Sequence, residues 1–166
     1  MANETKRISA AGLTELRQRE HAELRYYNDV ANNCTYGVGT LAHSGPCTSE
    51  ELARPVTVAQ VNAQLVAAIQ VAEQAVRRRV RRHELTQDQF DALISYTYNL
   101  GAGGAQAALT AADRAANQDV VREMNRNIYI HRRDANGRRL PPTPVQGLVN
   151  RRRDEAAPFQ ALRPPQ

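Results

Sequence analysis

Three side chains near the start of the chain have the types and the spacing that glycoside hydrolysis uses. Glu20 and Asp29 are two carboxylic acids nine positions apart, and Thr35 adds a hydroxyl six positions later. A glycosidase needs one carboxylic acid to protonate the leaving oxygen and one carboxylate to assist water or to stabilise positive charge on the sugar. The spacing alone favours two solvated surface acids, so the sequence around them decides the interpretation.

The segments around these residues predict a helix followed by a small sheet. Ser9 and the stretch Ala10 to Glu20 have the pattern of an N-capped helix, which places the glutamate near a helix C-terminus. The stretch from Leu24 to Thr40 is rich in Tyr, Val and Thr and is interrupted by Gly37 and Gly39, which is typical of a short, turn-rich β segment. We therefore expect both acids to face one cleft between helix and sheet.

The rest of the chain is predominantly helical by pattern. Two capping boxes, Thr57 to Gln60 and Thr86 to Gln89, predict the starts of two helices. The first carries a continuous apolar stripe through about Arg82, with a spacing of three and four residues: Val58, Val61, Leu65, Ile69, Ala72, Val76 and Val80. The second has the apolar face Phe90, Leu93, Ile94 and Tyr98 and ends at Gly101.

Shorter helices are expected beyond Gly101. The Ala-rich stretch to Ala116 and the segment Gln118 to Asn127 predict two of them, and a final helix is expected from about Val145 to Ala156. The segment Asp134 to Pro144 between them has the composition of a loop. The pattern predicts a mostly helical α+β chain with one small sheet.

The composition is that of a globular chain with a polyanionic partner. The chain has 166 residues, a net charge of +5 and no apolar run of the roughly 20 residues that a membrane helix needs. No apolar core follows Lys6 and Arg7, so we expect no secretory signal peptide. Five arginines from Arg77 to Arg82 favour a solvated helix face first, an anionic envelope polymer next and nucleic acid last.

The four histidines and two cysteines do not define a metal site. His21, His43, His83 and His131 lack metal-ligand spacing, so we expect no metal and no other cofactor. Cys34 and Cys47 can form one disulfide or remain two buried thiols. A disulfide would brace the loop that carries the neighbouring Thr35.

Three segments of the chain together resemble one known family. Glu20 and Asp29, with Thr35 in Cys34-Thr35-Tyr36-Gly37-Val38-Gly39, resemble the catalytic segment of phage-type lysozymes (glycoside hydrolase family 24). That family keeps the order Glu, eight residues, Asp, five residues, Thr, followed by a Gly-x-Gly turn. The segments 95–103 and 147–155 resemble its helix-end motif and its closing helix, so the resemblance covers about Ile8 to Phe159. Thr40 stands where many members have His.

The resemblance implies a role for each site residue. Glu20 would be the general acid, Asp29 the partner carboxylate, and Thr35 the hydroxyl that helps to hold the attacking water. Asn99 would present its amide to the sugar, with Tyr98 and Gly101 beside it in the same helix-end motif. Arg151 would lie near the catalytic glutamate and tune it, or else it is an ordinary solvated helix charge.

The resemblance also implies a fold and an activity. The expected fold is a single lysozyme-like domain over residues 1–166, with a β lobe at about 20–56, a connecting helix at about 57–82, and a helical lobe at about 86–157 together with the N-terminal helix. The expected activity is inverting hydrolysis of the β-1,4 bond from N-acetylmuramic acid to N-acetylglucosamine in peptidoglycan. The rivals are a lytic transglycosylase and a non-catalytic module that binds cell wall or nucleic acid.

The resemblance further implies how such an enzyme works in the cell. It would be made in the host cytoplasm and act as a monomer on glycan strands in the periplasm or cell wall. It would bind no nucleic acid and would carry no transmembrane segment. It would reach the wall through a lesion made by a separate membrane-permeabilising protein, and the outcome would be host lysis.

Overall fold

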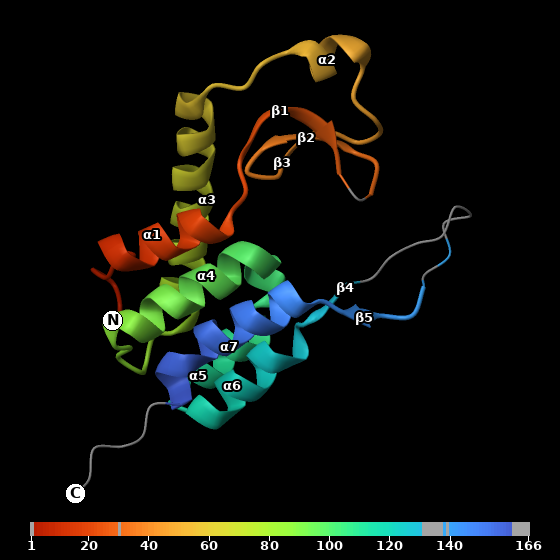
Figure 1. Ribbon diagram of the computed structural model, residues 1–166. Coiled ribbons are helices and arrows are strands. Elements are labelled where there is room, and N and C mark those ends of the chain that lie inside the picture. Colours follow the sequence, from red (N-terminus) through yellow and green to blue (C-terminus); the bar gives the residue numbers. More distant parts are fainter. Residues whose placement is uncertain (1, 30, 131–137, 139, 161–166) are drawn as a thin grey trace, which may run out of the picture. The chain divides into compact units, whose positions relative to one another are not determined.

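The protein, seen in a computed structural model that describes residues 2–29, 31–130, 138 and 140–160, consists of two compact units. The sheet unit comprises Leu13–Val71, and the helical unit comprises Met1–Gly12 and Ala72–Gln166. Figure 1 labels the elements of both. The expected combination of many helices with one small sheet near the N-terminus is confirmed.

The sheet unit contains a three-stranded antiparallel sheet of order β1-β2-β3, seen in Figure 1. The strands are β1 Glu23–Asn28, β2 Cys34–Gly37 and β3 Thr40–His43. A register shift between Glu23 and Tyr26 marks an irregularity in β1, and irregularities of this kind bend a strand. Opposite Thr35 in the ladder lies Tyr27, so these two side chains share one face of the sheet.

The turn after β2 requires glycine. Gly37 has a φ of 63°, in the region that side chains rarely adopt. A Cβ at this position would also lie 2.0 Å from Oε1 of Gln64, whose helix approaches the turn. The same Oε1 accepts a hydrogen bond from the N–H of Val38 at 3.4 Å. Gly39 also has a positive φ, of 86°, so positive φ at both positions explains the Gly-x-Gly pattern here.

Helix α1, Ala10–Arg19, begins at the predicted cap and ends one residue before the candidate acid. The hydroxyl of Ser9 accepts a hydrogen bond from the N–H of Gly12 at 3.0 Å. At the other end, the N–H of Glu20 donates to the carbonyl of Leu16 at 3.1 Å. The last helical hydrogen bond therefore fixes the backbone at Glu20.

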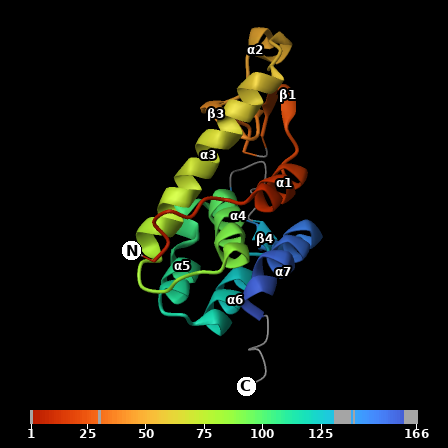
Figure 2. The ribbon, with the colours of Figure 1, turned by 90° about the vertical axis from the view of Figure 1, so that its left-hand side faces the viewer.

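Helix α3, Val58–Arg79, starts at the predicted capping box and ends earlier than predicted. Thr57 and Gln60 exchange the expected hydrogen bonds, at 2.8 and 3.2 Å. The helix stops at Arg79 and not near Arg82, because the N–H groups of Arg81 and Arg82 donate to the carboxylate of Asp113. Figure 2 shows this helix along its length.

The apolar stripe of α3 is buried as predicted apart from its first member. The buried members are Val61, Leu65, Ile69, Ala72, Val76 and Val80. Val58 is 60% exposed, so its place in the predicted core is wrong. It is the first residue of the helix, one turn before the stripe reaches buried surroundings.

The helical unit is built from four more helices and a small ladder. These are α4 Gln87–Gly104, α5 Gln106–Asp113, α6 Asn117–Arg126 and α7 Gln146–Gln160. Helices α4 and α6 pack against both α5 and α7. Thr86 and Gln89 form the predicted capping box of α4. The fully buried side chains that these helices share include Phe90, Leu93, Ile94, Leu109, Val120 and Met124.

Three details of this unit and its neighbour differ from the prediction. Strands β4 Tyr129–Ile130 and β5 Thr143–Pro144 pair with each other, although the second was expected as loop; of the expected loop 134–144, positions 134–137 and 139 lie outside the described residues. Helix α7 continues to Gln160 and contains Pro158. A short helix, α2 Ser49–Ala53, packs against β1 and was not predicted.

Candidate active site

Asp29 is held by the loop that follows β1. Its Oδ1 accepts hydrogen bonds from the backbone N–H groups of Ala31, at 2.8 Å, and Asn33, at 2.9 Å. The loop closes through backbone bonds between Asp29 and Asn32 and between Asp29 and Asn33. Two neutral donors thus fix one carboxylate oxygen and leave the other, Oδ2, for further contacts.

Thr35 supplies that further contact. Its hydroxyl lies 3.3 Å from Oδ2 of Asp29 and 3.4 Å from the carbonyl oxygen of Asn33, and either oxygen can accept its single proton. The side chain is only 3% exposed. Because the hydroxyl donates inward, its lone pairs remain to accept a hydrogen bond from a water molecule. The structure therefore brings together two of the three predicted catalytic residues, Asp29 and Thr35.

Glu20 lies in the same unit, at the end of α1, and is half-buried. Two residues, His21 and Ala22, lie between Glu20 and the first residue of β1. The N–H of Glu20 is used within the helix. Its backbone position is thus fixed by α1, whereas Asp29 is fixed by a loop.

A disulfide braces the segment that carries Thr35. Cys34 and Cys47 are joined, which settles the alternative left open by the sequence. The carbonyl of Gly45 accepts from the N–H of Cys34 at 2.7 Å, and the N–H of Gly45 donates to the side chain of Asn33 at 3.0 Å. The N–H of Cys47 donates to the side chain of Asn28, directly before Asp29. The loop from Gly45 to Cys47 thus holds Asn28 and Cys34, which directly precede Asp29 and Thr35.

The expected sugar-binding residues Tyr98, Asn99 and Gly101 lie at the end of α4, in the helical unit. Gly101, where the helix was predicted to end, has a φ of 74° and interrupts the helical geometry, although α4 continues beyond this kink to Gly104. Asn99 is exposed, and its Oδ1 accepts a hydrogen bond from Nη2 of Arg152. Because the amide oxygen is occupied, the Asn99 side chain presents its NH2 group as a donor.

Arg151 is not a solvated helix charge. Its guanidinium donates to Oε1 of Glu155 at 3.0 Å and to the carbonyl of Ser95 at 3.2 Å. Its side chain is only 11% exposed. The structure places this arginine in the helical unit with Asn99, on α7.

Arg152 and Glu155 form a buried pair that the sequence analysis did not single out. Both side chains are buried. Each guanidinium nitrogen of Arg152 donates a hydrogen bond: Nη1 to the carboxylate of Glu155, Nη2 to Oδ1 of Asn99, and Nε to the carbonyl of Asn127 at 3.1 Å. The guanidinium also lies over the ring of Tyr96, 4.8 Å from its centroid. Burial raises the pKa of Tyr96 to about 12. This network holds the Asn99 side chain, two residues before the kink of α4 at Gly101.

With this geometry in place, comparison with known proteins identifies the family. The profile of the family described as phage lysozyme matches residues 17–155, a span that includes Glu20, Asp29, Thr35, Asn99 and Arg151. The chain belongs to the phage lysozyme family. It is therefore a lysozyme-type glycoside hydrolase, and its activity is peptidoglycan hydrolysis.

Individual relatives agree with this membership. The endolysin of Salmonella phage P22 is 31% identical over 130 residues, which cover 77% of this chain and 80% of that protein. The endolysin of Escherichia coli O157:H7 phage FAHEc1 has a solved structure with a TM-score of 0.73 and 26% identity, and 98% of each chain is covered. The muramidase domain of SpmX from Asticaccaulis excentricus, at 22% identity and a TM-score of 0.70, shares the fold over 94% of this chain and 99% of that one.

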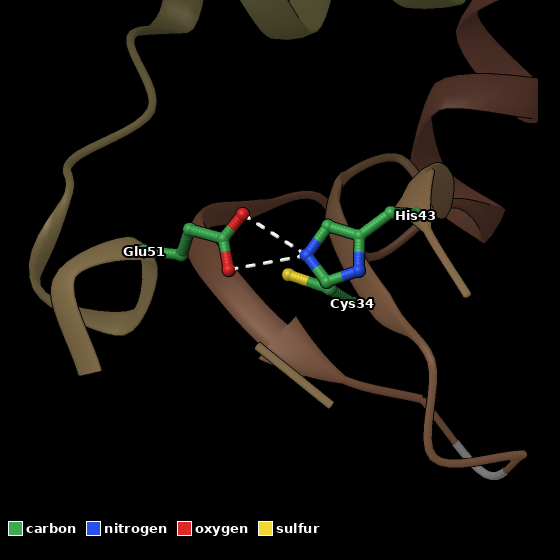
Figure 3. Close-up of side chains that lie close together, drawn as sticks. All are labelled: Cys34, His43 and Glu51. Carbon is green, nitrogen blue, oxygen red and sulfur yellow. Dashed lines mark hydrogen bonds and ion pairs between the residues drawn. The ribbon is translucent and has the colours of Figure 1, made fainter. Parts of the chain in front are cut away.

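A histidine and a glutamate lie beside the disulfide of this phage lysozyme family member. Figure 3 shows Nε2 of His43 facing the carboxylate of Glu51, at 3.0 and 3.1 Å, with the sulfur of Cys34 beside them. Because that sulfur belongs to a disulfide, it offers no thiolate to a metal. His43 lies in β3 and pairs with Cys34 in the sheet.

The two side chains form an ion pair when His43 is protonated, and the pKa values of both are shifted. The carbonyl of Ser44 and the carboxylate of Glu51 raise the pKa of His43. The N–H of Thr48 and the imidazole of His43 lower the pKa of Glu51 to about 2. Glu51 also caps α2 through Thr48, so the ion pair links β3 to that helix.

One other residue near the site, Tyr27, was missed by sequence reasoning. Tyr27 faces Thr35 across the ladder, and burial together with Glu23 and Asp29 raises its pKa. Only its alternation with Tyr26 along β1 could have indicated which tyrosine shares the face of Thr35.

None of the helices in the described part of this lysozyme-family chain combines the length and apolar character needed to cross a membrane.

Proposed function

We propose that this chain is an endolysin-type muramidase that hydrolyses the β-1,4 bond between N-acetylmuramic acid and N-acetylglucosamine with inversion. Glu20 protonates the leaving oxygen, Asp29 activates the water, and Thr35 positions that water. The observation that carries the proposal is the hydrogen-bonded pair of Asp29 and Thr35. An inverting glycosidase needs a carboxylate with a free lone pair beside a site for water.

The chemistry follows from the donors around Asp29. Two backbone N–H groups hold Oδ1, so the carboxylate cannot rotate away from its orientation. Oδ2 receives at most one weak bond from Thr35 and keeps a lone pair for a water proton. The water attacks the anomeric carbon while Glu20 gives its proton to the departing oxygen, which breaks the glycosidic bond and leaves a new reducing end.

The helical unit contributes substrate binding in this proposal. Asn99 donates its NH2 group to a sugar carbonyl or hydroxyl, and Arg152 keeps the amide in that orientation. Tyr98 and Gly101 shape the same helix end, and Arg151 tunes the acid Glu20. The enzyme acts as a monomer, without metal or organic cofactor, on glycan strands of the host wall, which it reaches through a lesion made by another protein.

The test compares wild type with Glu20→Gln on purified peptidoglycan in a turbidity assay. The amide cannot protonate the leaving oxygen, so we expect a loss of roughly 100-fold or more. Mass spectrometry of the products should show muropeptides with reducing ends. A variant that clears the suspension at the wild-type rate, or a product with an anhydro sugar, would contradict the assignment.

A further inference from the structure

Five arginines lie within six positions at the end of α3, and none is among the residues proposed for hydrolysis. They are Arg77, Arg78, Arg79, Arg81 and Arg82. Cations are favoured at a helix C-terminus because they offset the partial negative charge of its carbonyls. That effect is limited to the last turn, so it does not explain the two arginines that follow the helix.

Carboxylates lie near three of the five, because Asp113 attracts Arg81 as well as Arg82. Arg77 donates to Oε2 of the buried Glu73 at 3.2 Å and to the carbonyl of Lys6 at 2.8 Å. Arg82 lies 3.8 Å from the carboxylate of Asp113. These guanidinium groups are therefore partly neutralised by the fold itself.

Arg78 has a different environment. Its Nη2 donates to Oε1 of Gln74 at 2.8 Å, and this acceptor is a neutral amide. Within the described ranges no carboxylate pairs with Arg78 or with the exposed Arg79. A guanidinium has five N–H donors, so a single amide bond leaves most of the Arg78 group for an external anion.

The two arginines differ in what they line. Arg78 borders a pocket of about 560 Å3 together with Glu4, Gln74, Arg77 and Arg81, whereas Arg79 is not part of its wall. The wall of the pocket holds three guanidinium groups and the Glu4 carboxylate, and Glu73 outside the wall pairs with Arg77, so one positive charge remains. Forked guanidinium donors match phosphate oxygens, so a phosphate anion suits the donors that Arg78 leaves open.

The pocket is fixed by the N-terminal segment of the chain. The buried side chain of Asn3 donates to the carbonyls of Val80 and His83, at 3.0 and 2.9 Å, and accepts from the N–H of Leu85. Glu4 is the next residue, so its place in the pocket wall is set by these bonds. A wall held in this way needs little reordering when an anion binds.

We propose that this pocket binds the phosphate group of a phosphate monoester. Its volume exceeds that of a phosphate ion and leaves room for a small organic group such as a sugar. A lipid surface fits less well, because the residues that line the pocket include no large apolar side chain. Binding to a bilayer requires such groups beside the cations.

The experiment is calorimetric titration of the full chain with glucose 6-phosphate and with inorganic phosphate at low salt. Wild type, Arg78→Ala and the matched control Arg79→Ala are compared, since both substitutions remove one positive charge from the same turn of α3. We expect Arg78→Ala to weaken binding about tenfold, as the loss of a charge-assisted hydrogen bond implies. We expect Arg79→Ala to stay within about twofold of wild type.

Equal weakening in both variants would overturn the proposal, because it would mean that diffuse charge attracts the anion. Absence of binding to either probe would also overturn it. A third outcome, binding to phosphatidylglycerol vesicles but to neither phosphate probe, would assign the arginines to a membrane surface and reject the pocket. Thermal unfolding and peptidoglycan clearing should be unchanged in both variants, and Arg78→Gln gives a second test if Arg78→Ala fails to fold.

Discussion

Asp29 in the sheet unit and Glu155 in the helical unit are carboxylates in opposite environments. Asp29 is half-buried and bonds to two backbone N–H groups and a hydroxyl, all of them neutral. Glu155 is 1% exposed and bonds to the guanidinium groups of Arg151 and Arg152 and to the hydroxyl of Ser95.

On the proposed function, Asp29 is a reactive acid, whereas Glu155 is a structural one. Neutral donors orient Asp29 without cancelling its charge, and one of its oxygens keeps a lone pair for water. Two cations cancel the charge of Glu155, and three donors use up its oxygens. A buried pair of this kind stabilises little by itself, yet removing one partner leaves an uncompensated buried charge. Substitutions should therefore affect activity at one carboxylate and stability at the other.

The largest change in stability is expected for Glu155→Gln. The variant leaves two guanidinium groups with a neutral partner, so the free energy of unfolding should fall by about 3–5 kcal/mol in a urea titration. The matched control is Asp154→Asn, because Asp154 is the next residue and its side chain is 46% exposed. The control should change stability by less than about 1 kcal/mol. Equal losses would show that burial of Glu155 is not the cause.

The disulfide is expected to have the next largest effect. Replacing both Cys34 and Cys47 by Ala opens a link across 13 positions, and a loop of this length corresponds to about 3 kcal/mol of unfolding free energy. Reductant should destabilise wild type by a similar amount and leave the double variant unchanged. If the double variant melts at the wild-type temperature, the loop from Gly45 to Cys47 does not brace the site.

Thr35 should affect activity more than stability. Thr35→Val keeps the branched shape but removes the hydroxyl, so turnover should fall roughly 10- to 100-fold, as for the loss of a hydrogen bond to a charged group. Thr35→Ser keeps the hydroxyl and should retain most of the activity. Initial clearing rates of purified peptidoglycan measure both. Similar rates for the Val and Ser variants would remove Thr35 from the chemistry.

The smallest effect is expected at the exposed pair of His43 and Glu51. The lowered pKa of Glu51 adds stability above its ordinary value of 4.5, and this is lost as pH falls toward about 2. The raised pKa of His43 adds stability below its ordinary value of 6.5, and this is lost as pH rises through the folded-state value. His43→Gln should thus lower the melting temperature slightly between about pH 4.5 and 6.5 and not at pH 9. A constant difference across pH would contradict the ion pair.

Much of the helical framework could be predicted because local chemistry sets it. The capping boxes at Thr57 and Thr86 and the helix break at Gly101 each depend on a few neighbouring residues. The pair of two-residue strands β4 and β5 could not be found in this way, because so short a ladder has no periodicity. The early end of α3 depends on Asp113, which lies more than thirty positions away.

The candidate site likewise contains residues that local sequence could predict and residues that it could not. Glu20, Asp29 and Thr35 follow from a motif within sixteen residues. The burial of Arg152 and Glu155 could not be predicted, because charged residues on a helix are usually solvated and only the packing of α7 against α4 and α6 places these two inside. The contact from Arg152 to Asn99 joins residues 53 positions apart.

The most direct test of the account is the clearing rate of Asp29→Asn on purified peptidoglycan, measured beside its melting temperature. Asparagine keeps an oxygen for the N–H groups of Ala31 and Asn33, so the loop should persist and the melting temperature should stay within a few degrees of wild type. The rate should fall roughly 100-fold or more, because the amide cannot take a proton from water. A folded variant that clears peptidoglycan at half the wild-type rate would contradict the account.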